Sequence, residues 1–238
     1  MSDKRWSIWI DLEGFKSLLG SQSARAIGGL RELMEALFRI GAFVFPEPVE
    51  RLFIHQFGDG FVVVSDFQED SADRPISICV ALMRHLLSKG FVAKAAISTG
   101  DFGDISGCYP TIVRKNASSE RHVLHIGSGI MTIQTIMGSA LINAYAISDQ
   151  CKGSVLLLDI SRFLTVSSDI IMLSGAPALV DWIHTEFPMV SDICAKAGLN
   201  KLDPDMAEKK LKKYIDENDL PAEWIKSTLE SAGITAEN

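Results

Sequence analysis

The order in which apolar segments follow one another is the feature that most narrows the fold of this chain. Residues 6–12 carry bulky apolar side chains in close succession, which indicates a buried strand, and residues 22–42 place theirs on one face of a helix. The next segments indicate strands at 52–57 and 61–65, a helix at 74–89 and a strand at 91–99. Strand, helix, strand, strand, helix, strand is the order of a ferredoxin-like core.

The remaining residues add further elements to this core. Residues 101–120 are polar and contain glycine, which indicates a loop or arm, and from Pro177 onward the pattern is helical. Other expected elements are a short strand at 122–126, a helix at 139–150, a strand at 153–159 and amphipathic helices at 203–217 and 221–232. We therefore predict an α+β sandwich with a ferredoxin-like βαββαβ core in residues 1–175 and a helical C-terminal extension in residues 176–238.

Charge and composition exclude several classes of protein. A net charge of −7 argues against general nucleic-acid binding, which needs a basic surface. No stretch reaches the roughly 18 apolar residues of a membrane span, and the first ten residues hold too short an apolar run for a signal peptide. The four cysteines form no CxxC pair, so they are expected to be reduced thiols. These features predict a cytoplasmic protein without a nucleic-acid or membrane partner.

Two acidic residues stand where the predicted core would bring them together. Asp11 ends the first strand, and Asp59 lies in the Gly-Asp-Gly turn between the next two strands. Either acid alone is commonly a cap or turn residue. Neighbouring carboxylates repel unless a bound cation or a raised pKa relieves them. One such arrangement is a two-metal site, in which both carboxylates bind a pair of divalent ions about 4 Å apart. Carboxylate oxygens are hard ligands that suit Mg²⁺ or Mn²⁺.

The segment after Asp11 is expected to turn into a helix beside these ions. It consists of Leu12, Glu13, Gly14 and Phe15. Its backbone N–H groups and the helix N-terminus would form an anion site. We expect the Glu13 side chain to face solvent.

Four segments together resemble the motifs of class III nucleotidyl cyclase domains. They are IDLEGFKSLL at 10–19, QFGDGFVVV at 56–64, KAAISTG at 94–100 and, more approximately, GSALINAYAIS at 138–148. The resemblance covers residues 6 to about 159. It implies that the ribose 3′-hydroxyl attacks the α-phosphorus and expels pyrophosphate, with two Mn²⁺ or Mg²⁺ ions per site.

The resemblance also assigns roles to particular residues. Asp11 and Asp59 would bridge both ions, with the Leu12 carbonyl as a further ligand. Gly58 would belong to the nucleotide site, and Lys94 stands where the family often has an arginine that reaches the distal phosphates; a solvent-facing lysine is the alternative. The catalytic asparagine would be Asn143.

The chain departs from the family at the arginine that stabilises the reacting phosphorus. If Asn143 is the family's asparagine, Ile147 occupies the arginine position. One of three cations in or beside the arm, Arg114, Lys115 or Arg121, could supply this charge instead, from the same or from a second subunit. The alternative is that these side chains are solvated surface charges without a role in the site.

The two base-reading positions carry His55 and Thr135, neither of which is the usual purine-reading choice. A neutral histidine offers one donor and one acceptor, and threonine offers both from one oxygen, which could serve uracil or cytosine. A small cyclase with these changes resembles the pyrimidine cyclases of bacterial Pycsar anti-phage systems. That implies a Mn²⁺-dependent homodimer with sites at its interface, which converts UTP to 3′,5′-cyclic UMP and pyrophosphate. The product would be a second messenger for a separate effector.

Several alternatives remain open at this point. The enzyme could make cyclic CMP, or could be an adenylate cyclase. Ile147 favours a degenerate nucleotide-sensing module, whereas the intact Asp11, Gly58 and Asp59 favour an enzyme. The helices at 203–232 could also dock a partner, although a cap on the domain or a part of the dimer surface is the more ordinary role.

Overall fold

The structure is a computed structural model that describes residues 4–104, 108–116, 123–133, 136–163, 165–173 and 177–234. Its largest sheet has seven strands among these residues, in the order β10-β11-β9-β4-β1-β3-β2. The strands are β1 (Arg5–Leu12), β2 (Leu52–Phe57), β3 (Gly60–Ser65), β4 (Ala93–Gly100), β9 (Leu156–Leu158), β10 (Met172–Leu173) and β11 (Ala178–Val180).

Strand β1 lies at the centre of this sheet. It pairs antiparallel with β3 on one side and with β4 on the other, and β2 pairs antiparallel with β3. Strand β9 extends the sheet by pairing parallel with β4. Because alternate side chains of a strand face opposite sides of a sheet, β1 serves two different environments. Its even-numbered residues, Trp6, Ile8, Ile10 and Leu12, belong to the main hydrophobic core.

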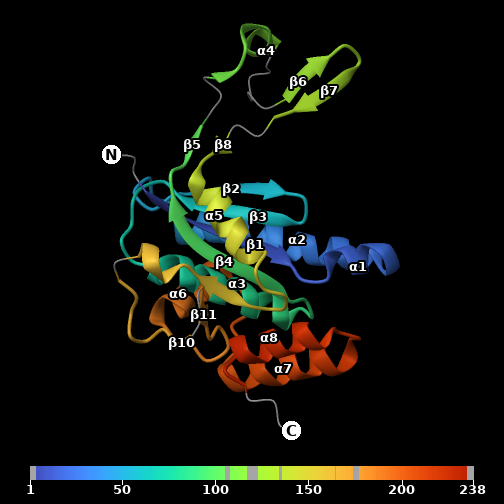
Figure 1. Cartoon of the computed structure of the whole chain (residues 1–238), viewed down its shortest axis with the longest axis vertical. Coiled ribbons are helices and arrows are strands. Elements are labelled where there is room, and N and C mark those ends of the chain that lie inside the picture. The colour runs from blue at the N-terminus through green and yellow to red at the C-terminus, as the bar shows by residue number, and fades with distance from the viewer. Residues whose placement is uncertain are drawn as a thin grey trace.

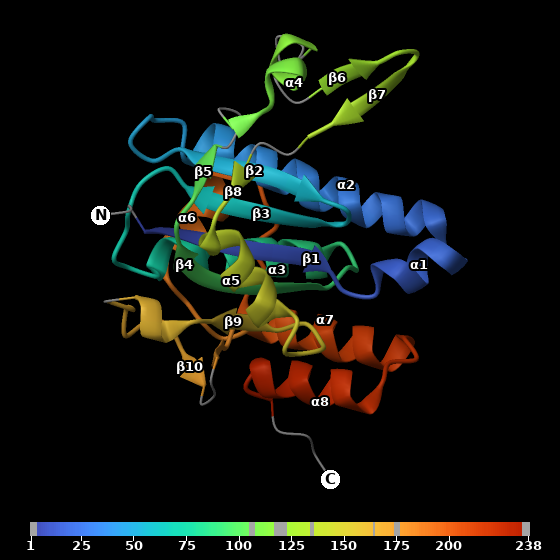
Figure 2. The same cartoon turned by 45° about the horizontal axis from the view of Figure 1, so that its top comes forward.

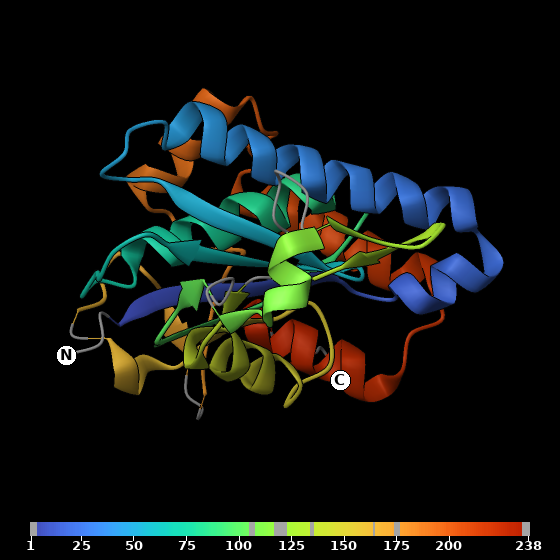
Figure 3. The ribbon, with the colours of Figure 1, turned by 90° about the horizontal axis from the view of Figure 1, so that it is seen from above.

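Helices cover the two faces of the sheet unequally, as Figure 3 shows. On the core side lie α2 (Ser23–Arg39), continued by a π-helical turn at Ile40–Val44, and α3 (Asp73–Ser88). Helix α5 (Ser139–Ser148) lies on the opposite face, over β4 and β1. It contributes Ile147 to a smaller cluster with Ala96, Val155 and Leu157. The face that carries Ser7, Trp9 and Asp11 is therefore the one only partly covered by a helix.

An arm extends beyond the sheet, as Figures 1 and 2 show. It is built from β5 (Gly103–Asp104), α4 (Thr111–Asn116), β6 (Val123–Ile126), β7 (Gly129–Thr132) and β8 (Ile136–Met137). Strands β6 and β7 form a hairpin, and β5 pairs with β8. The arm exposes large apolar side chains at Ile112, Ile126, Ile130 and Met137. Such a surface is typical of an interaction site.

The C-terminal segment contains α6 (Pro188–Ala197), α7 (Pro204–Glu217) and α8 (Ala222–Ser231). The Asp203 side chain caps α7 by accepting from the Met206 N–H at 2.8 Å. The prediction of helix throughout this segment is wrong at 178–180, because β11 pairs there with β9. The predicted domain boundary, between residues 175 and 176, lies outside the described residues. Strand β11, beyond that boundary, belongs to the main sheet.

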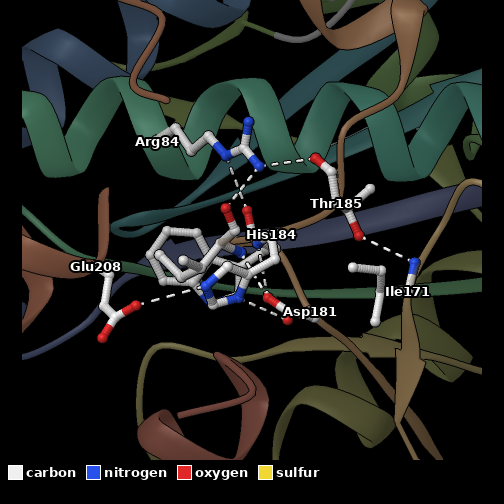
Figure 4. A network of polar contacts seen from close by, with 8 residues as sticks. Arg84, Ile171, Asp181, His184, Thr185 and Glu208 are labelled. Carbon is white, nitrogen blue, oxygen red and sulfur yellow. Dashed lines mark hydrogen bonds and ion pairs between the residues drawn. The ribbon is translucent and has the colours of Figure 1, made fainter. Parts of the chain in front are cut away.

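A buried polar network fastens the chain after β11 to α3 and α7, as Figure 4 shows. Arg84 of α3 is 2% exposed and donates to the carbonyls of Trp182, Ile183 and Thr185. The Asp181 carboxylate contacts His184 Nδ1 at 2.8 Å, and His184 Nε2 lies 3.5 Å from Glu208. Because one buried guanidinium donates to three backbone carbonyl groups, this network is expected to be rigid.

The described chain is thus a mixed α/β structure around one large sheet. No helix in the described ranges combines the length and the apolar character needed to cross a membrane. All four cysteines are free, with Cys79 and Cys194 buried.

Candidate active site

Asp11 lies near the end of β1, between the two strands that also carry the other candidate residues. Across the sheet it pairs with Gly60 of β3 on one side and with Lys94 of β4 on the other. Odd numbering places it on the partly covered face with Trp9. The even-numbered side chains of β1 therefore face the main hydrophobic core, and the Asp11 carboxylate faces the opposite side of the sheet.

The Asp11 carboxyl is largely buried, and its Oδ1 has no hydrogen-bond partner among the described residues. Burial raises the pKa of this group from 3.8 to about 6; the charge of Lys94 opposes the rise, and Glu13 and Asp59 add to it. A buried carboxylate oxygen without a partner is energetically costly. Such an atom is what a cation would relieve.

The β2–β3 hairpin brings Asp59 to the same place. Gly58 has φ of +64°, so the turn needs glycine there. Gly60 lies directly opposite Asp11, and a Cβ added to it would be 2.8 Å from the Trp9 ring. These two glycines therefore let the hairpin tip approach β1 closely. The Asp59 charge is near enough to raise the pKa of Asp11.

The donors at this point fit a hard divalent cation. Two carboxylates, one with an orphaned buried oxygen, are oxygen ligands of the kind that Mg²⁺ and Mn²⁺ prefer. Among the described residues no group of three or more His, Cys, Asp or Glu side chains could enclose a metal ion. The protein itself would thus supply an incomplete ligand set, as is usual for ions that arrive with phosphates.

Glu13 departs from its predicted position, and its neighbour Lys94 is also less exposed than a surface lysine. The Glu13 side chain does not face solvent: it is 13% exposed and lies 3.3 Å from Lys94 Nζ. The indole N–H of Trp224, on α8, donates to its other carboxylate oxygen at 2.7 Å. The prediction was wrong because both partners are remote in sequence. Lys94 is 8% exposed, so the solvent-facing alternative for it is also excluded.

The segment 12–15 is only partly available to a ligand. The Leu12 side chain is in the core, and the Glu13 N–H donates to the Val92 carbonyl at 3.0 Å. Gly14 adopts φ of +74° before α1 (Phe15–Ser21), and the Phe15 ring packs against the main core. The anion site predicted here therefore loses the Glu13 amide as a donor.

His55 lies on the same face of the sheet as Asp11, two strands away. It pairs with Val62, which in turn pairs with Trp9. Its Nε2 is buried without a hydrogen-bond partner among the described residues, and burial lowers its pKa. The ring centroid of Phe102 lies 6.2 Å from that of His55. A neutral histidine with an unpaired nitrogen is chemically suited to read a hydrogen-bonding ligand.

The structure does not bring Asn143 next to Asp11 within one chain. Its amide donates to the Thr99 carbonyl at 2.9 Å, and Thr99 pairs with Trp6. Trp6 is five residues along β1 from Asp11, which corresponds to about 16 Å. Ile147, at the expected arginine position, is buried in the small cluster under α5.

The other candidates belong to the arm. Arg114 and Lys115 are exposed in the last turn of α4. Thr135 and Arg121 lie outside the described residues. Neither of the two described cations is part of an ion pair that the structure records with the residues of the candidate site.

Sequence reasoning missed two aromatic residues that shape this site. Trp9 stands two residues before Asp11 on the same face of β1, and its ring lies 4.9 Å from that of Tyr145 on α5. Its odd position in β1 could have placed it beside Asp11. Trp224 lies 211 residues from Glu13 in sequence, and no local pattern connects them.

Comparisons with known proteins leave the family unassigned. No protein-family model matches the chain, and no curated protein does. Among solved structures, a bacterial light-regulated adenylyl cyclase is similar with a TM-score of 0.45 and 10% sequence identity. The similarity covers 90% of this chain and 58% of that one, so the chain spans under two thirds of the length of that cyclase. The assignment of a function therefore depends on the site residues.

Proposed function

We propose that this protein is a two-metal nucleotidyl cyclase that converts UTP to 3′,5′-cyclic UMP and pyrophosphate. The observation that carries the proposal is the buried Oδ1 of Asp11, which has no hydrogen-bond partner among the described residues. It lies on the partly covered face of the sheet, beside the hairpin of Asp59. A carboxylate held in this way costs stability unless it binds a cation. Its presence at this position is more readily explained by metal chemistry than by folding.

The arrangement of strands supports a class III cyclase core. Residues 5–100 form strand, helices, strand, strand, helix and strand, and the strands lie in the order β4-β1-β3-β2. This is the order of the ferredoxin-like βαββαβ fold. On it, the three motifs that resemble cyclases converge, because β1 carries Asp11, the β2–β3 turn carries Asp59 and β4 carries Lys94.

The mechanism follows from these residues. Asp11 and Asp59, with the Leu12 carbonyl, would hold two Mn²⁺ or Mg²⁺ ions. When bound, the ions lower the pKa of the ribose 3′-hydroxyl and offset the charge of the triphosphate. The 3′-hydroxyl loses its proton to water, and its oxygen forms a bond to the α-phosphorus. The bond from that phosphorus to the bridging oxygen breaks, and pyrophosphate leaves. The Lys94 ammonium would bind the distal phosphates of the triphosphate, and this contact would persist while the pyrophosphate leaves.

A second copy of the chain would complete the site. Asn143 bonds to the strand next to β1 at the opposite end of β1 from Asp11. Among the described residues, Lys94 is the only cation that the structure pairs with Asp11, Glu13 or Asp59. On the same face, α5 exposes Ile142 and Tyr145, and the arm exposes further apolar side chains. We propose a homodimer in which these surfaces meet and Asn143, with Thr135 and a cation of the arm, faces the nucleotide of the other subunit.

His55 supports the choice of a pyrimidine. Its unpaired Nε2 and lowered pKa suit a neutral ring that offers one donor and one acceptor to the base. UTP is proposed ahead of CTP as substrate, with cyclic UMP as a cytoplasmic second messenger of anti-phage defence that acts on a separate effector. Cytidylate or adenylate cyclase activity would keep the same metal chemistry with a different base.

One observation favours a second candidate, a nucleotide-sensing module without catalysis. Ile147 is buried in a hydrophobic cluster, so no charge reaches the reacting phosphorus from that position. This module would bind a nucleotide through the same face without turning it over.

The test incubates purified protein with Mn²⁺ or Mg²⁺ and each of ATP, GTP, CTP and UTP, and identifies products by mass. Cyclic UMP and pyrophosphate in equal amounts, from the UTP sample, are expected. The Asp59→Asn variant, with the same circular dichroism as the parent, should form no product. Nucleotide binding without any cyclic product would favour the sensing module instead.

A further inference from the structure

Glu13 joins three elements that are distant in sequence. Its carboxylate lies 3.3 Å from Lys94 Nζ on β4 and accepts the indole N–H of Trp224, on α8, at 2.7 Å. Its own backbone N–H donates to the Val92 carbonyl. The residue two positions after Asp11 is therefore fixed by β4 and by the C-terminal helix at the same time.

These contacts are shielded from solvent. The side chains of Glu13 and Lys94 are 13% and 10% exposed, and Trp224 is 6% exposed. Exposed ion pairs contribute little to stability, because water screens the two charges and the long side chains remain mobile. Here the bond from the indole restricts Glu13, and the carboxylate in turn restricts the flexible lysine chain. A cation that is fixed before its ligand arrives loses less entropy on binding.

Helix α8 does not depend on Trp224 alone for its place. The Thr228 hydroxyl accepts the Ser154 N–H at 2.9 Å, and the Ser231 hydroxyl accepts the Leu156 N–H at 3.4 Å. A Cβ on Gly153 would be 2.5 Å from the Thr228 oxygen, so the packing there is close. Removing the indole N–H should therefore leave the helix docked.

We propose that Trp224 is a positioning residue for the candidate active site. Through Glu13 it fixes the Lys94 ammonium beside Asp11, where that charge receives the distal phosphates of a nucleoside triphosphate. This inference rests on the proposed function and adds to it: helix α8 supports the substrate site from behind, through Glu13. Trp224 itself touches no substrate.

The experiment compares Trp224→Phe with Trp182→Phe. Both variants lose one buried indole donor, but Trp182 donates to the Ser154 carbonyl and not to Glu13. Binding of 3′-deoxy-UTP with Mn²⁺ is measured by calorimetry, because this nucleotide keeps the triphosphate and lacks the hydroxyl that cyclises. The dissociation constant is expected to rise at least about tenfold in Trp224→Phe, the scale of a lost hydrogen bond to a charged group. In Trp182→Phe it should stay within twofold.

Kinetics with UTP separate positioning from a general disturbance. Because Lys94 would contact the phosphates both before and during the reaction, Trp224→Phe should raise KM and leave kcat within about twofold. Glu13→Gln keeps an acceptor for the indole but removes the charge that holds Lys94. It should weaken binding similarly, and adding Trp224→Phe to it should add little.

The outcomes separate the two proposals. Equal dissociation constants for the parent and Trp224→Phe, or equal weakening in both tryptophan variants, would overturn the positioning role and leave the cyclase proposal intact. A parent protein that binds no 3′-deoxy-UTP and cyclises none of the four nucleotides would overturn the proposed function, and the positioning role with it.

Discussion

Replacing Asp11 with asparagine should make the metal-free protein more stable while removing its response to Mn²⁺. Burial and neighbouring carboxylates raise the pKa of Asp11 from 3.8 to about 6, a difference of roughly two units. Each unit corresponds to about 1.4 kcal/mol, so the ionised carboxylate costs the folded state about 3 kcal/mol at neutral pH. Asparagine has nearly the same shape and carries no charge.

The sign of the pH dependence follows from the direction of the shift. A carboxyl whose pKa is raised on folding destabilises the protein fully above the folded value, and the penalty is relieved as the pH falls through 6 toward 3.8. The Asp11→Asn variant should therefore exceed the parent by about 3 kcal/mol at pH 7.5. The difference should shrink to below about 1 kcal/mol near pH 4.

Urea unfolding with EDTA, at pH 7.5 and at pH 4, measures this difference. Asp192→Asn, an exposed position on α6, is the control and should change stability by less than about 0.5 kcal/mol. Saturating Mn²⁺ should stabilise the parent, by about 2.7 kcal/mol at 100 times its dissociation constant, and should not stabilise Asp11→Asn. A variant less stable than the parent at pH 7.5, or equally stabilised by Mn²⁺, would refute the reasoning.

Three further predictions concern the surroundings of Asp11. Gly60→Ala would place a Cβ 2.8 Å from the Trp9 ring and should cost about 1–3 kcal/mol in urea unfolding, whereas Gly103→Ala, with open space around it, should not. Ile142→Glu, on the exposed face of α5, should convert the dimer into a monomer in sedimentation velocity experiments, whereas the control Ile27→Glu, on α2, should remain a dimer. A dimer in both variants would place the interface elsewhere. His55→Phe removes the unpaired Nε2 and should lower kcat/KM for UTP at least about tenfold relative to ATP, and an unchanged ratio would mean that His55 does not read the base.

The parts of the site that depend on local pattern could be predicted from the sequence. The close succession of bulky apolar side chains in residues 6–12 identified β1 and placed Asp11 near its end, in the register that β1 forms with β3 and β4. The Gly-Asp-Gly turn required the hairpin, because its geometry is set by a few adjacent residues. Helix α2 was likewise visible from its apolar face, although its last predicted turn is a π-helical one.

The parts that depend on distant contacts could not be predicted. Glu13 follows a strand and precedes a glycine, which is typical of a solvated turn, yet its partners are Lys94 and Trp224 on two remote elements. The three residues of β11 carry no period that separates a short strand from a helix, and only pairing with β9 decides between them. Both errors arise where tertiary contacts override local preference.

The number of Mn²⁺ ions bound per chain tests the central claim most directly. Electron paramagnetic resonance of free Mn²⁺, titrated with protein and saturating 3′-deoxy-UTP, gives this number without turnover once the Mn²⁺ bound by the nucleotide in a protein-free sample is subtracted. The account predicts two ions for each chain of the parent protein, and a loss of binding in both Asp11→Asn and Asp59→Asn. Unchanged Mn²⁺ binding in both variants would contradict it, because the ions would then be held by residues other than this pair of carboxylates.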